Sequence, residues 1–274
     1  MSTLVIPLVS AGNVPQLFTD VVLHSLANEF KFVKELDSRW LHPFVGPLDY
    51  VADQETTLYR DIPNRKYTAS LELFHNESRG LYLLQQRSPV LQGYENEFCK
   101  YVLIPLIQEL TPKRVLVLDS VGAFESNVPM KVDSSGSRFS FATCDATSIE
   151  DVAQEFQERL QLDKDTELSI NRSLFKFTDS SFQDGISTTQ FIFKLSYHLL
   201  HTSIPVSSDF AGIFYFSMFI HEGDNHQDAL LTCEILPQLM PSFPAIKKVV
   251  TPVSWSGVYG LKTVPDGFCE GLYV

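Results

Sequence analysis

The stretch Leu4-Val5-Ile6-Pro7-Leu8-Val9, followed by Ser10-Ala11-Gly12-Asn13, decides the fold. Its first six residues form an apolar run of strand length, which is typical of a strand buried on both faces. The next four have the side chains of a tight turn. Apolar residues then recur at helical spacing, at Val14, Leu17, Phe18, Val21 and Val22. We therefore predict a strand, a turn and a helix in succession.

The same unit recurs later in the chain. A second buried strand is predicted at Arg114–Asp119, after a helical pattern over residues 98–110 in which Pro105 predicts a kink or a break in the helix. A third strand, Phe210–Ile220, precedes a helical pattern over Ala229–Leu236. Buried strands that alternate with amphipathic helices predict an α/β fold, a three-layer α/β/α sandwich around a largely parallel central sheet.

Further elements are expected around this centre. Residues 71–74 and 81–85 have the pattern of two strands, which we interpret as an antiparallel hairpin. Ile186–Leu200 is predicted to be an apolar helix.

The chain has no composition break that indicates a linker, and no internal repeat. We predict a single domain over residues 1–274, with an irregular insertion at residues 120–185. Glycines at 267 and 271 suggest a flexible C-terminal tail over residues 265–274.

Composition excludes several classes of protein. With 44% apolar residues, the chain is not of the disordered type. It has no run of roughly 18–20 apolar residues, the length of a membrane helix. The 21 basic and 33 acidic side chains give a net charge of −12, which argues against a protein that grips nucleic-acid phosphates.

The compartment is inferred from the cysteines and the N-terminus. The four cysteines are scattered without a CxxC pair, which favours reduced thiols. The first residues lack the basic region and cleavage site of a secretory signal. We expect a cytosolic protein and leave the nucleus open.

Catalytic motifs are absent from the sequence: it contains no GxSxG, GxxxxGK[ST], GxGxxG or HExxH. The turn at Gly12 leaves two interpretations. Backbone N–H groups at a helix N-terminus can hold a phosphate, and a glycine permits close approach. In the simpler interpretation, Gly12 supplies the backbone angles of the turn and Asn13 caps the following helix.

Residues 221–228, H-E-G-D-N-H-Q-D, concentrate potential ligands. Their spacing fits neither a zinc pattern nor an EF-hand loop, so we predict a structural turn and neither a metal nor another cofactor. Two alternatives remain. One is a metal-dependent module built on this segment; the other is a nucleoside- or phosphate-binding α/β enzyme that uses the Gly12 turn and Glu222 or Asp224.

The last residues, Leu272, Tyr273 and Val274, form a hydrophobic–tyrosine–X pattern. This pattern suits capture of a C-terminal carboxylate by a buried lysine of a partner, while the tyrosine ring fills a cleft and its hydroxyl bonds at the rim. The alternative is a terminus whose last apolar residues pack back on the fold.

Three segments together resemble one known family, that of proteasome assembly chaperone 2. They are residues 7–17, P-L-V-S-A-G-N-V-P-Q-L, with Asp20 beyond; residues 219–225, F-I-H-E-G-D-N, with Asp228-Ala229-Leu230; and residues 252–255, P-V-S-W. The resemblance is specific at both ends of the chain, and no part of residues 120–185 contributes to it.

The resemblance implies a non-enzymatic protein that forms a heterodimer with proteasome assembly chaperone 1. This heterodimer is expected to bind the α-subunit ring of the 20S core particle during assembly. The resemblance also implies a fold related to nucleoside phosphorylases without their activity. The implied ring-binding element is the tail Leu272, Tyr273 and Val274, inserted in a lysine-bearing pocket between α subunits, where it would keep regulatory particles off immature cores.

Overall fold

A seven-stranded sheet lies at the centre of the computed structural model. The model describes residues 2–49, 57–122, 139–144, 191–200, 210–220, 223–240 and 243–257. The order of the strands across the sheet is β2-β5-β6-β1-β7-β9-β8. Their bounds are β1 Thr3–Pro7, β2 Lys31–Glu35, β5 Leu71–Asn76, β6 Leu81–Gln86, β7 Arg114–Gly122, β8 Phe139–Cys144 and β9 Gly212–Ile220.

The four central strands β6, β1, β7 and β9 run parallel, and antiparallel pairs flank them on both sides. In this centre Val5 of β1 pairs with Leu116 of β7, and Leu116 pairs with Phe214 of β9. The predicted antiparallel hairpin is confirmed as β5 and β6. All five residues of β1 are buried, as expected for a strand covered on both faces.

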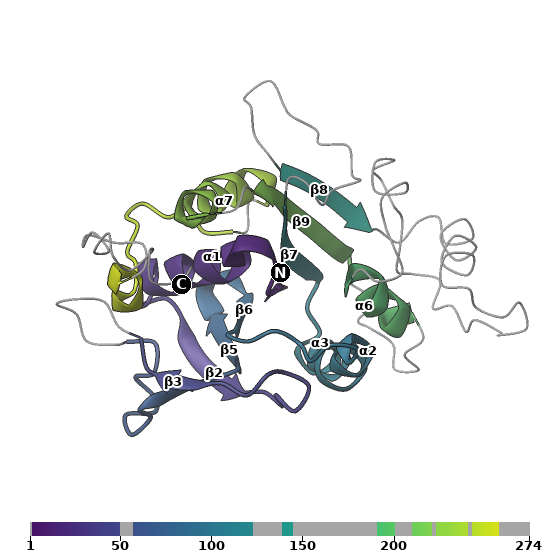
Figure 1. The fold of residues 1–274 in the computed structure, drawn as a ribbon, viewed down its shortest axis with the longest axis horizontal. Helices are drawn as coiled ribbons and strands as arrows, with labels where there is room; N and C mark the ends of the chain where they lie inside the picture. Colours follow the sequence, from purple (N-terminus) through teal and green to yellow (C-terminus); the bar gives the residue numbers. More distant parts are fainter. Residues whose placement is uncertain are drawn as a thin grey trace, which may run out of the picture.

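Helices cover both faces of the sheet, so the three-layer α/β/α sandwich is confirmed (Figure 1). Helix α1, Val14–Ser25, and helix α7, His226–Leu239, pack against each other on one face. The other face carries α2, Glu95–Phe98, a π-helical turn Cys99–Leu103, α3, Ile104–Leu110, and α6, Phe191–Leu200. Pro105, which predicted a kink or a break in the helical pattern, is the second residue of α3 and directly follows the π-helical turn.

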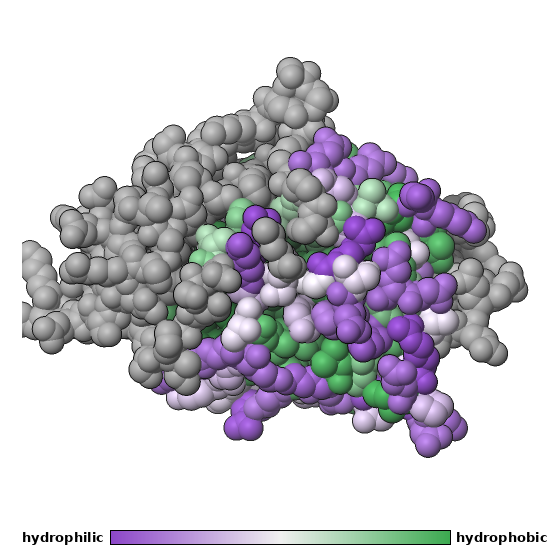
Figure 2. Space-filling view, turned by 180° about the vertical axis from the view of Figure 1, so that it is seen from behind, coloured by the Kyte–Doolittle hydropathy of each residue, from purple (hydrophilic) through white to green (hydrophobic). Residues whose placement is uncertain are grey.

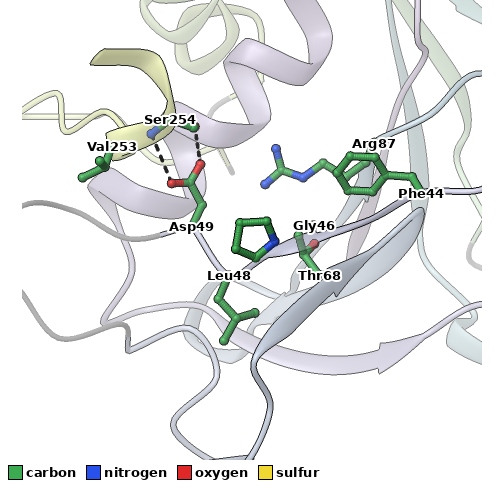
Figure 3. Close-up of a pocket in the computed structure, with 9 residues that line it drawn as sticks. Phe44, Gly46, Leu48, Asp49, Thr68, Arg87, Val253 and Ser254 are labelled. Atoms are coloured by element: carbon green, nitrogen blue, oxygen red, sulfur yellow. Dashed lines mark hydrogen bonds between the residues drawn. The ribbon is translucent and has the colours of Figure 1, made fainter. Parts of the chain in front are cut away.

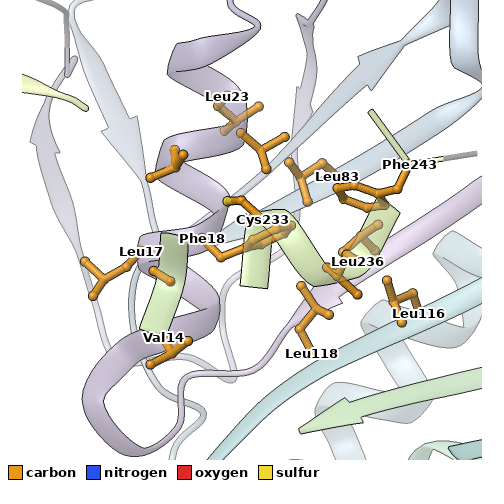
Figure 4. Packing of buried hydrophobic residues seen from close by; sticks show 14 of the residues in the cluster. Val14, Leu17, Phe18, Leu23, Leu83, Leu116, Leu118, Cys233, Leu236 and Phe243 are labelled. Atoms are coloured by element: carbon orange, nitrogen blue, oxygen red, sulfur yellow. The ribbon is translucent and has the colours of Figure 1, made fainter. Parts of the chain in front are cut away.

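Each face of the sheet has its own hydrophobic core. Under α1 and α7, apolar side chains from both helices meet those of the central strands (Figure 4). They include Val14, Leu17, Phe18 and Leu23 of α1, Leu83, Leu116 and Leu118 of the sheet, Cys233 and Leu236 of α7, and Phe243. Full burial of one such large apolar side chain contributes roughly 1.5–3 kcal/mol, so this packing fixes α1 rigidly on the sheet.

Some elements differ from the sequence prediction. Strand β1 ends at Pro7, so Leu8 and Val9 belong to the connection that follows it. Within residues 120–185, predicted to be irregular, residues 120–122 complete β7 and Phe139–Cys144 form β8 at the edge of the sheet. The remainder of that stretch and residues 186–190 lie outside the described residues.

A second, two-stranded sheet consists of β3, Val45–Pro47, and β4, Tyr67–Ala69.

Figure 2 shows hydrophobic residues among hydrophilic ones on the side of the molecule that faces away in Figure 1. Of the helices in the described part of the chain, none is long and apolar enough to span a bilayer.

Candidate functional site

The predicted tail, Leu272–Val274, lies outside the described residues. The structure does describe most of the three segments that carry the family resemblance, residues 7–17, 219–230 and 252–255. The Gly12 turn, just before α1, packs against Asn225 of the second segment, and Asp20 in the middle of α1 bonds to Trp255 of the third. Helix α1 therefore connects the three segments.

The Gly12 turn packs directly against the connection between β9 and α7. Gly12 has a φ of +62°, in the region that favours glycine. A Cβ atom at Gly12 would lie 2.4 Å from Nδ2 of Asn225 and 2.5 Å from Cδ1 of Ile220. Both the backbone angle and the close approach therefore require glycine, which confirms the predicted role of Gly12 in the turn.

The prediction for Asn13 is wrong. Asn13 occupies the N-cap position of α1, but its side chain makes no capping hydrogen bond. Its φ is +53°, a left-handed conformation, whereas a capping residue has an extended backbone that aims its side-chain oxygen at the first free N–H groups.

Serine hydroxyls fasten the Gly12 turn to the neighbouring strand. Ser10 Oγ lies 2.8 Å from Ser120 Oγ and accepts a hydrogen bond of 3.0 Å from the Ser120 N–H. The Ser120 hydroxyl also donates to the Ala11 carbonyl at 2.5 Å. These polar groups are bonded within the protein, and Asn225 occupies the space beside Gly12. The geometry therefore favours the structural interpretation of the turn over a phosphate cradle.

The described part of the β9–α7 connection has the geometry of a helix-initiating turn. Asp224 Oδ1 accepts a hydrogen bond of 3.0 Å from the His226 N–H and lies 2.8 Å from His226 Nδ1. Asn225 Nδ2 donates to the Gly223 carbonyl at 2.8 Å. Partial burial opposes the charged form of Asp224, but the hydrogen bonds from His226 outweigh it and lower the pKa of this carboxyl.

His221 and Glu222, which the metal and enzyme alternatives both use, lie outside the described residues. Within the described ranges, no three histidine, cysteine, aspartate or glutamate side chains come together as a metal site.

Asp20 is the centre of a buried polar cluster in the middle of α1. Its carboxylate accepts a hydrogen bond of 2.8 Å from Gln85 Nε2 and lies 3.2 Å from Nη1 of Arg87. The indole N–H of Trp255 donates to the same carboxylate at 3.4 Å. Trp255 is itself buried. Asp20 thus ties the third segment to α1 across 235 positions of sequence, a role that the sequence pattern did not indicate.

His24, one helical turn after Asp20, is also buried. Burial lowers the pKa of its imidazole, and this effect outweighs the opposite influence of the Asp20 and Asp49 carboxylates. The side chain is therefore neutral at neutral pH.

A cavity of about 340 Å³ opens beside this cluster (Figure 3). Asp49 on its wall accepts hydrogen bonds from the hydroxyl and the backbone N–H of Ser254. The cavity is lined mainly by apolar groups, from Phe44, Gly46, Pro47, Leu48, Asp49, Thr68, Arg87, Val253 and Ser254. Because Val253 and Ser254 lie just before Gly257, the last described residue, the C-terminal segment leaves the described fold close to this cavity.

A second buried carboxylate supports one wall of the cavity. Glu72 is fully buried and accepts hydrogen bonds of 2.6 Å from the Tyr59 hydroxyl and 2.9 Å from the Thr68 hydroxyl. Arg65 forms an ion pair with it. This network fixes Thr68, a lining residue, against the main sheet. The only sequence signal was an acidic residue within the apolar strand pattern of residues 71–74.

Asp119 and Tyr215, on the adjacent strands β7 and β9, form another pair that no sequence motif indicated. The Tyr215 hydroxyl donates to Asp119 Oδ2 at 2.5 Å, and the Ser120 N–H donates to Oδ1 at 2.8 Å. Burial raises the pKa of Asp119, and burial together with the Asp119 carboxylate raises the pKa of Tyr215. The signal available in the sequence was the aspartate that closes the apolar run from Arg114.

Comparisons with known proteins place this geometry in context. The model of the PAC2 family matches residues 4–233. A proteasome assembly chaperone 2 from Saccharomyces cerevisiae is 37% identical over 98% of this chain and 99% of its own length. A proteasome assembly chaperone 2 from Mus musculus is 25% identical over 85% of this chain and 79% of its own. A crystal structure of a Thermoplasma acidophilum protein of unknown function, 11% identical, covers 90% of this chain and 78% of its own with a TM-score of 0.51, a likeness of fold alone.

Proposed function

Because the chain belongs to the PAC2 family, we propose that it is a non-enzymatic chaperone of 20S proteasome assembly. The observation that carries this proposal is the similarity to a proteasome assembly chaperone 2 along nearly the whole of both chains. The closed Gly12 turn supports a role without catalysis, since its polar groups bond within the protein.

In this proposal the chain acts in the cytosol as a heterodimer with proteasome assembly chaperone 1. The heterodimer binds the α-subunit ring of the 20S core particle and assembly intermediates that contain it. A single short tail buries little surface and binds weakly. A second tail on a rigid partner raises the avidity through effective concentration, which gives a physical reason for a two-chain chaperone.

The ring-binding element is the tail Leu272, Tyr273 and Val274. Its α-carboxylate pairs with a lysine in a pocket between adjacent α subunits, while the tyrosine ring and Leu272 supply apolar burial. Occupied pockets are closed to regulatory particles that use similar tails. The Asp20–Trp255 hydrogen bond supports this role, because it anchors the chain only a few residues before the C-terminal segment.

The first test is binding of the heterodimer to purified α-ring intermediates by surface plasmon resonance. Deletion of residues 272–274 is expected to weaken binding at least about tenfold, because the carboxylate contact and the tyrosine burial are both lost. Addition of one glycine after Val274 is expected to do similar damage, since it displaces the carboxylate but keeps every side chain.

A matched control is Val249→Ala, which changes an exposed apolar residue within the described fold. This variant is expected to bind like the unmodified chain. Circular dichroism and partner co-purification confirm that each variant is folded and dimeric. If the extended chain binds the ring as tightly as the unmodified chain, capture of the carboxylate is wrong.

A further inference from the structure

The cavity beside Asp20 combines apolar walls with two polar groups of opposite kind. Phe44, Pro47, Leu48 and Val253 supply apolar lining. Figure 3 shows the Arg87 guanidinium, a donor, and the Asp49 carboxylate, an acceptor, on different sides of the same space. An apolar site with one donor and one acceptor suits a neutral ligand group that can both accept and donate a hydrogen bond.

Arg87 has donors that the described residues do not use. Its guanidinium bonds to Asp20 through Nη1, while Nε has no hydrogen-bond partner. Nε itself is buried, but the side chain as a whole keeps 18% of its surface exposed and lines the cavity, so it is the terminal N–H groups of the guanidinium that can face a ligand. Because the Asp20 carboxylate already balances the positive charge of the guanidinium, Arg87 does not need a second anion. Its remaining N–H groups can donate to a neutral oxygen.

The opposite wall offers an acceptor. Asp49 is held by the hydroxyl and backbone N–H of Ser254, and a carboxylate has room for further hydrogen bonds. A phenol meets all three requirements, since its ring is apolar and its hydroxyl accepts from one side and donates to the other.

We propose that this cavity is a binding site for a tyrosine side chain, and that its occupant is Tyr273 of the chain's own C-terminal segment. The ring lies between the apolar walls, and its hydroxyl accepts from Arg87 and donates to Asp49. Docking requires only the cavity and the tyrosine. The effect on ring binding described below rests additionally on the proposed function.

The position of the described chain end supports this occupant. Val253 and Ser254 line the cavity, and the seventeen residues 258–274 follow directly after Gly257. Fully extended, the sixteen residues to Tyr273 span at most roughly 55 Å, far more than a return to the cavity requires. A ligand tethered by a segment this short has an effective concentration in the mM range, so even a weak site is filled.

Docking in the cavity limits how much of the tail is available to a partner. When nine-tenths of the molecules hold Tyr273 in the cavity, the apparent affinity of the tail for another receptor falls about tenfold. The receptor must then outcompete the cavity, which favours sites that add further contacts, such as a lysine for the α-carboxylate. The cavity thereby suppresses weak, nonspecific engagement of the tail.

The test uses the full chain with 3-azidotyrosine, a photoreactive amino acid that keeps the phenol hydroxyl, in place of Tyr273. After irradiation, mass spectrometry is expected to find cross-links to residues 44–49 and 253–254. Val253→Asp places a charge on the apolar wall and is expected to lower the cross-link yield at least about tenfold. The matched control is Val249→Asp, because Val249 is 46% exposed and does not line the cavity, and its yield is expected to stay unchanged.

A competition arm keeps the test decisive if Val253→Asp fails to fold. An excess of a synthetic peptide of residues 267–274 is expected to lower the cross-link yield, whereas the same peptide with Tyr273→Ala is not. The proposal is overturned if cross-links from position 273 avoid the cavity, or if both peptides compete equally. Tyr259 is the other tyrosine among residues 258–274, so the photoreactive group is also placed there. Cross-links to the cavity from position 259 and not from position 273 would also overturn the proposal.

Isotope mixing identifies whose tail is bound. In an equal mixture of ¹⁴N- and ¹⁵N-labelled chains, cross-links within a single isotope are expected, and mixed pairs would show that a second copy supplies the tyrosine. The α-ring assay remains separate. Cross-links at the cavity without ring binding contradict the proposed function only, and ring binding without these cross-links contradicts the docking only.

Discussion

Two polar sites lie along helix α1, one at its start and one beside its middle, and they differ in whether their hydrogen-bonding groups all have partners within the protein. At its N-terminus, the turn from Ser10 to Gly12 bonds to Ser120 and is filled by Asn225. Beside its middle, the cluster around Asp20 borders an open cavity and leaves Arg87 Nε without a partner among the described residues. Both sites include residues of the family resemblance. Residues of the family resemblance therefore form a structural joint at one site and border the cavity of the proposed docking at the other.

The largest expected effect comes from Asp20→Ala, which removes the centre of the second site. Gln85, Arg87 and Trp255 all lose their shared acceptor. Loss of one partner of a buried charge pair costs about 3–5 kcal/mol in the free energy of unfolding. Urea denaturation followed by tryptophan fluorescence measures this change.

Asp37→Ala is the matched control for Asp20→Ala. Asp37 pairs with Arg39 at the surface, and its side chain is 41% exposed. A surface pair contributes at most about 1 kcal/mol, so the two aspartates are expected to differ clearly. Equal losses in the two variants would contradict the role of Asp20 as the centre of the cluster.

Gly12→Ala tests whether the first site is closed. The new methyl group overlaps Asn225 and Ile220 and also strains a backbone at a φ of +62°. We expect a loss of about 2–4 kcal/mol. Gly93→Ala, at a φ of +85° with open space around it, is expected to cost only about 1 kcal/mol. The same urea experiment compares them, and indistinguishable losses would mean that the turn is not tightly packed.

Ser120→Ala removes one hydroxyl from the first site without changing its shape. The loss leaves the Ala11 carbonyl and Ser10 without this partner. We expect a decrease of about 1–2 kcal/mol in the free energy of unfolding, measured by thermal and urea denaturation. An unchanged stability would show that the two serines do not fasten the turn to β7.

The smallest effect concerns pH and the imidazole of His24. Its pKa in the folded protein lies below the ordinary 6.5, so the unfolded state binds the proton first as the pH falls. Stability therefore decreases as the pH drops through 6.5 and stops decreasing below the folded pKa. Its contribution between pH 7.5 and 5.5 is at most about 1.4 kcal/mol.

His24→Gln is expected to remove this part of the pH dependence. Unfolding free energies of both chains at the two pH values measure it, and other titrating groups cancel in the difference. Identical slopes for the two chains would rule out a neutral buried His24.

Much of the fold could be predicted from local patterns. The apolar run Arg114–Asp119 and the helical spacing of apolar residues from Val14 onward indicate, from local sequence alone, which side chains are buried. Strand β2, Lys31–Glu35, was missed, because K-F-V-K-E at the edge of a sheet has little of the apolar signal of a central strand. The cap at Asn13 was mispredicted, because the left-handed backbone of the turn overrides the usual preference of asparagine.

The candidate site was far less predictable. Gly12 could be assigned to a turn from its own neighbourhood. The contact of Asp20 with Trp255 joins residues 235 positions apart, and no local pattern encodes such a pairing. Likewise, the cavity exists only because the segment around Leu48 meets Val253 in space. Local sequence therefore indicates where a turn or strand forms, while the shape of a site depends on distant parts that meet after folding.

The hydrogen bond between Asp20 and Trp255 also has a consequence for how the protein is made. During synthesis at about 5–20 residues per second, roughly 10–50 s pass between the appearance of the two residues. Strand β1 must likewise wait for β7, its partner more than a hundred positions later. The nascent chain therefore presents an incomplete sheet for much of its translation, and contacts of such long range make folding slow. Completion of this domain is in that sense a late event that depends on nearly the entire chain having left the ribosome.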